Sequence, residues 1–127
     1  MSSFSDYTEN AVLNHVFRNT AMTSPASVHL ALYTAAPTDA GGGTQVTGGG
    51  YARQPVTFGA PSGGATSNTA TVSFTASGAA FGTVVAVGLF DAATAGNLLA
   101  WAPITSATIG DGDTLSFAAG EIDVTLT

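Results

Sequence analysis

The sequence predicts a mainly β protein: an antiparallel β-sandwich preceded by one N-terminal α-helix. Three observations support this fold class. The chain has 127 residues, the size of one domain. Apolar residues recur at helical spacing only within residues 5–19, and short segments with a period of two fill residues 27–127. About seven such segments, separated by Gly, Asp and Asn turns, are typical of a sandwich with jelly-roll or Greek-key connections, which periodicity does not distinguish.

The predicted helix, residues 5–19, has apolar side chains mostly three or four positions apart: Tyr7, Val12, Leu13, Val16 and Phe17. Ser5 or Asp6 can cap its first turn, because either side-chain oxygen accepts a hydrogen bond from a backbone amide two or three residues on. Pro25 follows the helix and bars its continuation. Because an isolated helix this short is marginally stable in water, we expect its apolar side to lie on the sheet.

The first predicted strands lie between long Gly-rich loops. Residues 28–33 alternate between Val28, Leu30 and Leu32 on one side and His29 on the other, which predicts a strand with one buried face. After a loop at 35–50, residues 51–58 form a second strand, with Pro55 indicating a sheet edge or a bulge. Another Gly-rich turn at 59–67 leads to a third strand over residues 70–74.

The second half of the chain contains the remaining four predicted strands. Residues 83–90 are apolar on both faces and are predicted to form a central strand. A turn at 91–97 precedes the strand 98–104, which carries Trp101. The Gly-Asp-Gly-Asp segment at 110–113 is a tight hairpin signal before a strand at 114–117. Alternation over residues 122–126 closes the domain.

Composition excludes several classes of function. The chain holds two arginines and no lysine against eight acidic residues, a net charge of −6, which opposes binding to nucleic acid or to an acidic membrane surface. It has no cysteine, which excludes disulfides and thiolate metal sites. Only 8% of its residues are charged, a composition typical of surfaces covered by partners; the alternative is a monomer with a Thr/Ser-rich surface.

No spacing in the sequence indicates a catalytic or cofactor site. His15 and His29 are too few for a zinc site, and no Gly-x-Ser-x-Gly motif is present. Asp111 and Asp113 are expected to hold the hairpin turn; the alternative is a weak surface calcium site shared with a neighbouring loop. We therefore predict no enzyme activity, no cofactor and no bound metal.

Four residues are predicted to anchor an interface, since aromatic residues and arginine dominate binding hot spots: Tyr51, Arg53, Phe58 and Trp101. For Arg53 two hypotheses remain open. It pairs with a carboxylate at a subunit boundary, or it is an exposed charge on an edge strand.

Four segments in order resemble a family of small bacteriophage virion structural proteins, often labelled tail fibre or minor structural proteins. They are FSDYTENAVLNHVFRNT, VHLALYTAAPTDAGGG, GGGYARQPVTFGAPSGG and VGLFDAATAGNLLAW, and the resemblance extends to the closing GDTLSFAAGEIDVTL. The resemblance implies a non-enzymatic part of the virion. With no signal-peptide pattern after Met1 and no apolar run of about 20 residues, we expect assembly in the host cytoplasm and no membrane contact.

The first functional hypothesis is a capsid decoration, or cement, protein that binds the major capsid protein as a homo-oligomer, with a trimer favoured. A compact domain without repeats or a coiled coil favours this over a fibre. The alternative is a minor tail or tail-fibre module that binds tail proteins and recognises a glycan receptor. Its aromatic platform would be Trp101 with Asn97, or Tyr51 with Gln54.

Overall fold

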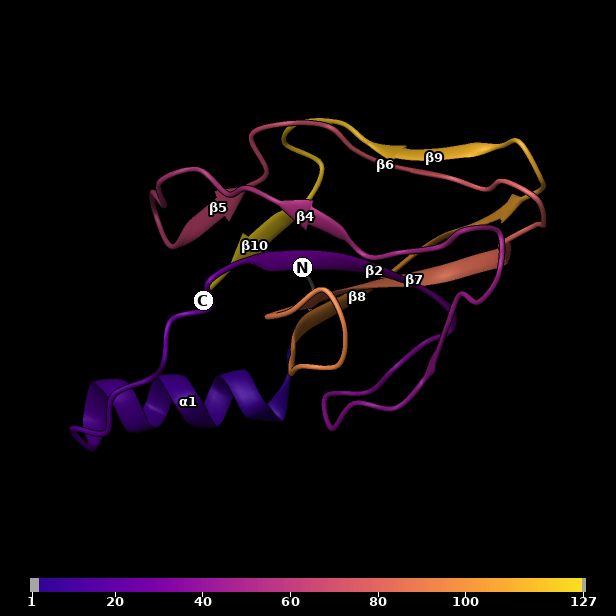
Figure 1. Cartoon of the computed structure of the whole chain (residues 1–127). Coiled ribbons are helices and arrows are strands. Elements are labelled where there is room, and N and C mark those ends of the chain that lie inside the picture. Colours follow the sequence, from indigo (N-terminus) through magenta and orange to yellow (C-terminus); the bar gives the residue numbers. More distant parts are fainter. Residues whose placement is uncertain (1–2, 127) are drawn as a thin grey trace.

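The computed structural model describes residues 3–126 as two layers of antiparallel strands with one helix set apart from them (Figure 1). The helix and the strands have the following bounds: β1 Ser3–Phe4, α1 Asp6–Phe17, β2 Val28–Ala35, β3 Thr44–Gln45, β4 Gln54–Val56, β5 Ala65–Ser67, β6 Val72–Thr75, β7 Gly82–Phe90, β8 Leu98–Ile109, β9 Thr114–Phe117 and β10 Asp123–Thr125. The mainly β fold with one N-terminal helix is confirmed.

The larger layer is a six-stranded sheet in the order β1-β8-β7-β2-β3, with β4 also paired to β2. The smaller layer consists of two separate ladders, β6 with β9 and β5 with β10. All seven predicted strands are present. Three short strands that periodicity did not reveal, β1, β3 and β5, are two or three residues long.

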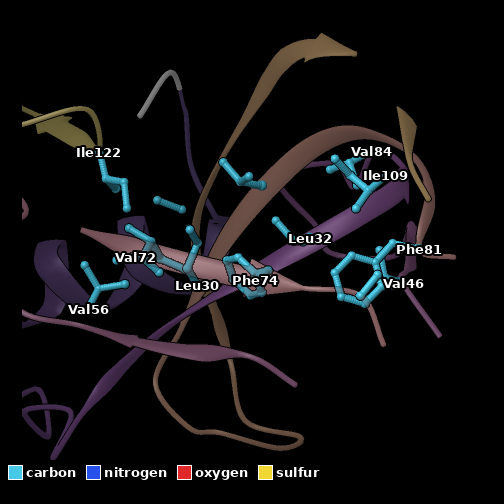
Figure 2. Close-up of a cluster of buried hydrophobic side chains, with 14 residues drawn as sticks. Leu30, Leu32, Val46, Val56, Val72, Phe74, Phe81, Val84, Ile109 and Ile122 are labelled. Atoms are coloured by element: carbon cyan, nitrogen blue, oxygen red, sulfur yellow. The ribbon is translucent and has the colours of Figure 1, made fainter. Parts of the chain in front are cut away.

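The core lies between the two layers and is formed by apolar residues of both (Figure 2). Leu30 and Leu32 of β2 are fully buried, as is Val84 of β7, and Phe74 of β6 covers them from the smaller layer. The six-stranded sheet therefore has one face that is dry and closely packed.

Strand β7 is central, as its sequence predicts, because it pairs with β8 on one side and β2 on the other. The expectation that β2 buries only one face is wrong. Ala31 and Tyr33, on the opposite face from Leu30 and Leu32, are 0% and 2% exposed. They form a second, smaller apolar cluster with Phe90.

Two further predictions concern the ends of strands. Pro55 does lie at an edge: in β4 it faces His29, and β4 pairs with β2 alone. The segment 110–113 does form a tight turn, in which the amide of Asp113 donates to the carbonyl of Gly110 at 3.0 Å. The turn does not close a hairpin, because β9 leaves β8 and pairs with β6 in the other layer.

The helix begins and ends close to its predicted positions, but its expected packing is wrong. Ser5 is the N-cap, and its hydroxyl accepts a hydrogen bond from the Thr8 amide at 3.2 Å. Only Thr8 of α1 is buried, whereas Leu13, Val16 and Phe17 are 53%, 60% and 77% exposed. In Figure 1 the helix lies below the strands, with its C-terminal end at the far left. Within the described chain, no helix is long and apolar enough to span a bilayer.

Candidate functional site

A cleft of about 480 Å³ opens on the face of the six-stranded sheet that lies opposite the main core. Three segments meet there: the first turn of α1, the loop 36–45 and the loop 91–98. The side chains that give the cleft its chemistry are Tyr7, Tyr33, Asp39, Gln45, Phe90 and Asn97. A concave site of this size, formed by loops on a rigid sheet, is typical of small-ligand binding.

The first turn of α1 is held to β8 by a group of hydrogen bonds. The Ser5 amide donates to the carbonyl of Leu99 at 3.0 Å, and the Thr8 hydroxyl donates to the same carbonyl at 2.7 Å. The Ser5 hydroxyl also donates to the carbonyl of Leu98. Both side chains are buried, so the start of the helix forms a rigid wall of the cleft.

Asp39 joins the loop 36–45 to the rest of this wall. Its carboxylate accepts hydrogen bonds from the hydroxyl of Ser3 and from Nε1 of Trp101, the latter at 2.9 Å. These two bonds lower the pKa of Asp39, which is therefore ionised at neutral pH. Its backbone carbonyl accepts from the amide of Asp6 at 2.8 Å.

Three carboxylates gather at this edge of the cleft. Oxygen atoms of Asp6, Glu9 and Asp39, which we call the acidic cluster, all lie within 4.8 Å of one another. The first two are also in the first turn of α1, where the helix dipole favours negative charge. The cluster makes the rim of the cleft strongly negative.

The loop 91–97, which also lines the cleft, is held in shape by hydrogen bonds between its two ends. The carboxylate of Asp91 accepts from the backbone amide of Asn97 at 2.7 Å and from its side-chain amide at 3.0 Å. Burial acts to raise the pKa of Asp91, but these hydrogen bonds outweigh it and the pKa is lowered. Gly96 has φ +75°, and a Cβ there would lie 2.5 Å from the Asp91 carboxylate, so this turn requires glycine.

Arg53 holds the same loop against the sheet. One guanidinium nitrogen donates to the carbonyls of Ala92 and Ala95 at 3.0 and 2.7 Å. The guanidinium carbon lies 3.6 Å from the centre of the Phe90 ring, a cation–π contact. Arg53 is thus engaged within the chain, and its pairing with a carboxylate at a subunit boundary, one of the two hypotheses for this residue, stays a prediction.

The floor of the cleft consists of Tyr33 and Phe90. Burial raises the pKa of Tyr33 to about 12, so its hydroxyl stays protonated at physiological pH. Gly88 lies beneath these rings, and a Cβ there would approach Cε2 of Tyr33 to 2.9 Å. The floor is therefore closely packed and cannot shift easily.

The structure separates the four predicted anchor residues. Tyr51 and Arg53 meet at Gln45, whose side-chain oxygen accepts from both at 3.3 Å. Trp101 lies on β8, half-buried and bound to Asp39. Phe58 is also half-buried and packs against the main core, in an isolated bridge with Asn68.

The side chain of Tyr51 packs against the main core. Its ring stacks on Phe74 with ring centres 6.1 Å apart and meets Phe81 edge-on at 6.0 Å, and its hydroxyl accepts from the Leu32 amide at 3.0 Å. Burial raises its pKa. The ring that was expected to form a platform with Gln54 is therefore part of the core packing.

Sequence reasoning missed Asn68, which is 3% exposed. Its side-chain amide donates to the carbonyls of Ala70 and Ala118 at 2.9 and 3.1 Å, and its oxygen accepts from the amides of Gly120 and Ile122 at 3.0 and 2.9 Å. Three of these contacts cross about 50 residues of chain, so no local pattern could have revealed them.

The two aspartates considered for calcium each bind a backbone amide. Asp111 accepts from the amide of Gly78 at 2.9 Å, and Asp113 accepts from the amide of Gly110 at 2.8 Å. Asp113 therefore holds the turn, whereas Asp111 ties it to Gly78, and the turn is not the hairpin that was expected. The two histidines lie apart: His15 accepts from the amide of Met22 at 3.2 Å, and His29 lies on β2.

A second surface of interest lies on α1. We call Leu13, Val16 and Phe17 the α1 face. Val16 and Phe17 follow Leu13 by three and four residues, and these side chains project away from the buried Thr8. Glu9 lies four residues before Leu13 and so shares this side. An exposed apolar patch bordered by charge is typical of a protein–protein contact.

The comparisons with known proteins identify the family. No curated protein matches the chain significantly. A family model described as "Podophage GP4 fiber I protein gp80" matches residues 3–125, almost the whole chain. The resemblance to phage virion structural proteins is thereby confirmed, and of the two functional hypotheses the fibre alternative fits this family better than capsid decoration. The chain belongs to the podophage GP4 fiber I protein family.

Proposed function

We propose that this protein is a non-enzymatic component of a phage tail fibre and that α1 attaches it to a larger virion protein. The observation that carries this proposal is the exposed α1 face on an otherwise well-packed domain. The family match supports a fibre component, and the helix supplies a means of attachment.

The exposure of the α1 face is unfavourable unless a partner covers it. Burying one Leu, Val or Phe side chain contributes about 1.5–3 kcal/mol, and Leu13, Val16 and Phe17 are each more than half exposed. A helix of 12 residues is marginal in water without tertiary packing, and here only its first turn is packed. Docking into an apolar groove would both bury this face and stabilise the helix.

Charge defines the partner's chemistry. Two members of the acidic cluster, Asp6 and Glu9, precede Leu13 by seven and four residues, so they lie on the same side of α1 as the α1 face, toward the N-terminal end of the helix. A groove that receives this surface would be apolar at one end and would carry lysine or arginine at the other. The partner we propose is therefore a protein with a basic, apolar groove.

A second copy of the chain satisfies this requirement less well. Its two cations are both engaged within the chain, Arg53 with the loop 91–97 and Arg18 with Asn14 at 3.1 Å. A parallel bundle of α1 helices around a threefold axis would also bring the acidic clusters together, which costs free energy. The trimer favoured by the sequence stays a prediction, and we propose that any such trimer uses a different surface.

The test uses the phage that encodes this chain, with the gene deleted and variants supplied from a plasmid. Leu13→Ser and Phe17→Ser remove apolar contact from the α1 face. Leu126→Ser is the matched control, because Leu126 is also exposed, at 58%, and lies outside the helix. The measurement is the number of copies per purified virion by quantitative mass spectrometry.

We expect incorporation of the two α1 variants to fall at least about tenfold, and that of the control to stay unchanged. Normal incorporation of both α1 variants would refute docking through α1. Light scattering of the purified wild-type chain tests the alternative that a second copy of this chain binds the α1 face. Self-association lost in Phe17→Ser but kept in Leu126→Ser would assign the α1 face to a second copy and overturn the proposed partner.

The copy number of the wild-type protein distinguishes the fibre from the capsid decoration hypothesis. A fibre component is expected in small multiples set by the symmetry of the tail. On the order of hundreds of copies, in a simple ratio to the major capsid protein, would instead support decoration of the head.

A further inference from the structure

We propose that the cleft between α1 and the loops 36–45 and 91–98 binds an uncharged saccharide ring, a neutral hexose or an N-acetylhexosamine, and excludes acidic sugars. The cleft contains no residue of the α1 face, although it shares Asp6 and Asp39 of the acidic cluster with the proposed docking surface, and the inference goes beyond attachment to the virion. Its arguments are the size of the cleft, an unpartnered hydroxyl at its floor and the charge of its rim.

The lining of the cleft has the mixture that a sugar ring requires. The volume of about 480 Å³ is ample for one or two sugar units. Tyr7 lies at its rim, 41% exposed, and offers an aromatic surface on which the apolar face of a sugar can stack. Asp39 and Asn97, from two different loops, also line the cleft and supply a carboxylate and an amide for hydroxyl groups.

The Tyr33 hydroxyl is the independent sign that this cleft accepts a polar ligand. Tyr33 is 2% exposed, and within residues 3–126 its hydroxyl has no hydrogen-bond partner in the protein. Every fully enclosed side-chain nitrogen or oxygen in that range does have one, so this hydroxyl reaches the cleft, which Tyr33 lines. A protonated hydroxyl at the base of a cleft both donates to and accepts from a sugar hydroxyl.

The rim decides which sugars enter. Asp6, Glu9 and Asp39 place three carboxylates at one edge of the cleft, and Asp39 is held ionised by Ser3 and Trp101. A carboxylate on the sugar would meet like charge at this edge, and Arg53, which contacts the Phe90 ring of the floor, is already engaged by the loop 91–97. The hydroxyl groups of a neutral sugar can instead donate hydrogen bonds to the same carboxylates.

Both walls are ordered before any ligand binds. Ser5 and Thr8 fix the start of α1, and Arg53 with the Asp91–Asn97 pair fixes the loop 91–97. A preorganised site loses little entropy on binding. For one sugar unit we expect a dissociation constant in the millimolar range, which several copies on one particle would raise by avidity.

The experiment is saturation-transfer difference NMR on the whole purified chain with matched pairs of soluble sugars. Glucose is compared with glucuronic acid, galactose with galacturonic acid, and N-acetylglucosamine with N-acetylneuraminic acid. At least one neutral member is expected to give transfer that saturates with concentration, and its acidic counterpart is expected to give none. Absence of transfer from every neutral sugar would overturn the proposal, as would equal transfer from the acidic members.

Two variants locate the binding site. Tyr33→Phe removes only the hydroxyl and keeps the packing of the floor, and we expect affinity to fall about fivefold. Tyr7→Ala removes the exposed ring, with an expected loss of about tenfold, whereas Tyr7→Phe keeps the ring and most of the affinity. The control is Thr83→Ala, an exposed position on β7 outside the cleft.

Circular dichroism and the single tryptophan, Trp101, verify that each variant is folded. Saccharide binding unchanged in both Tyr33→Phe and Tyr7→Ala would show that the sugar binds elsewhere and would overturn the assignment of the cleft. None of these substitutions lies in the α1 face, so normal incorporation of Tyr33→Phe into virions separates this proposal from the proposed function.

Discussion

Strand β2 and helix α1 each carry apolar residues at the period of their own secondary structure, but the protein buries only the strand. Leu30, Leu32 and Tyr33 of β2 are at most 2% exposed, whereas Leu13 and Phe17 of α1 are 53% and 77% exposed. The strand is paired on both sides and packed on both faces. The helix is held only through its first turn.

An apolar pattern therefore predicts that a face will be covered, but it does not predict whether the same chain or another protein covers it. For β2 the cover comes from β6 and from the loops of the same chain. For α1 we propose that it comes from another protein. Stability of the isolated domain should therefore depend on β2 and its neighbours and depend little on the α1 face.

The largest expected effect comes from truncating the core strand. Leu32→Ala leaves a cavity between the layers and should lower the free energy of unfolding by about 2–5 kcal/mol. The matched substitution Leu13→Ala removes the same atoms from an exposed helix position and should change it by less than about 0.5 kcal/mol. Urea denaturation followed by Trp101 fluorescence measures both. Equal losses would contradict the comparison and show that α1 packs on the domain in solution.

The next effect concerns Asn68, which ties the segment 118–122 to the smaller layer. Asn68→Ala leaves the buried amide of Ile122 without its acceptor, whereas the amide of Gly120 keeps the backbone carbonyl of Asn68, and we expect a loss of about 1–3 kcal/mol. Asn14→Ala, at a half-buried helix position, serves as control and should change stability by less than about 1 kcal/mol. If thermal unfolding shows no difference between the two, the four hydrogen bonds of Asn68 do not contribute as we propose.

A smaller effect on stability is expected at Arg53, which holds the loop 91–97 against the sheet. Arg53→Met removes the hydrogen bonds to Ala92 and Ala95 and the cation–π contact, for a loss of about 1–2 kcal/mol. Hydrogen exchange of amides in the loop 91–97 should accelerate, while that of β7 should change only with global stability. Unchanged exchange in the loop would show that the Asp91–Asn97 pair is sufficient to order it.

The smallest expected effect is the pH dependence of stability that comes from Asp39. Its pKa is lowered in the folded protein by Ser3 and Trp101. A lowered pKa contributes stability that is present above the ordinary carboxyl pKa and is lost as the pH falls through the folded value. The advantage of the wild type over Asp39→Asn should therefore shrink below about pH 4. An advantage that is constant across the acid range would contradict this account.

Several features followed from sequence because their causes are local. Ser5 caps the helix through an amide three residues away, and Pro55 occupies an edge because it has no amide to donate. The doubly apolar pattern of 83–90 placed β7 at the centre of the sheet. The paired strands β1, β3 and β5 escaped detection, because two or three residues are too few to show a period.

The candidate site was only partly predictable. The sequence singled out Trp101 with Asn97 as one half of a glycan platform, and the structure places Asn97 in the cleft and Trp101 behind Asp39. Tyr33 and Asp39 were not identified, because one looked like an ordinary strand residue and the other lay in a Gly-rich loop. The position of Asp39 depends on its hydrogen bond with Trp101, 62 residues away, which no motif records.

The fold class, the helix, most of the strands and the lack of lysine and cysteine could be read from the sequence, since each depends on composition or on neighbours within a few residues. Which apolar faces are covered by other parts of the same chain depends on the tertiary structure. It turned the Gly110–Asp113 turn into a crossing between layers, buried both faces of β2 and left the α1 face exposed. These outcomes depend on long-range pairing, and pairing is chosen by the combined packing of strands far apart in the chain.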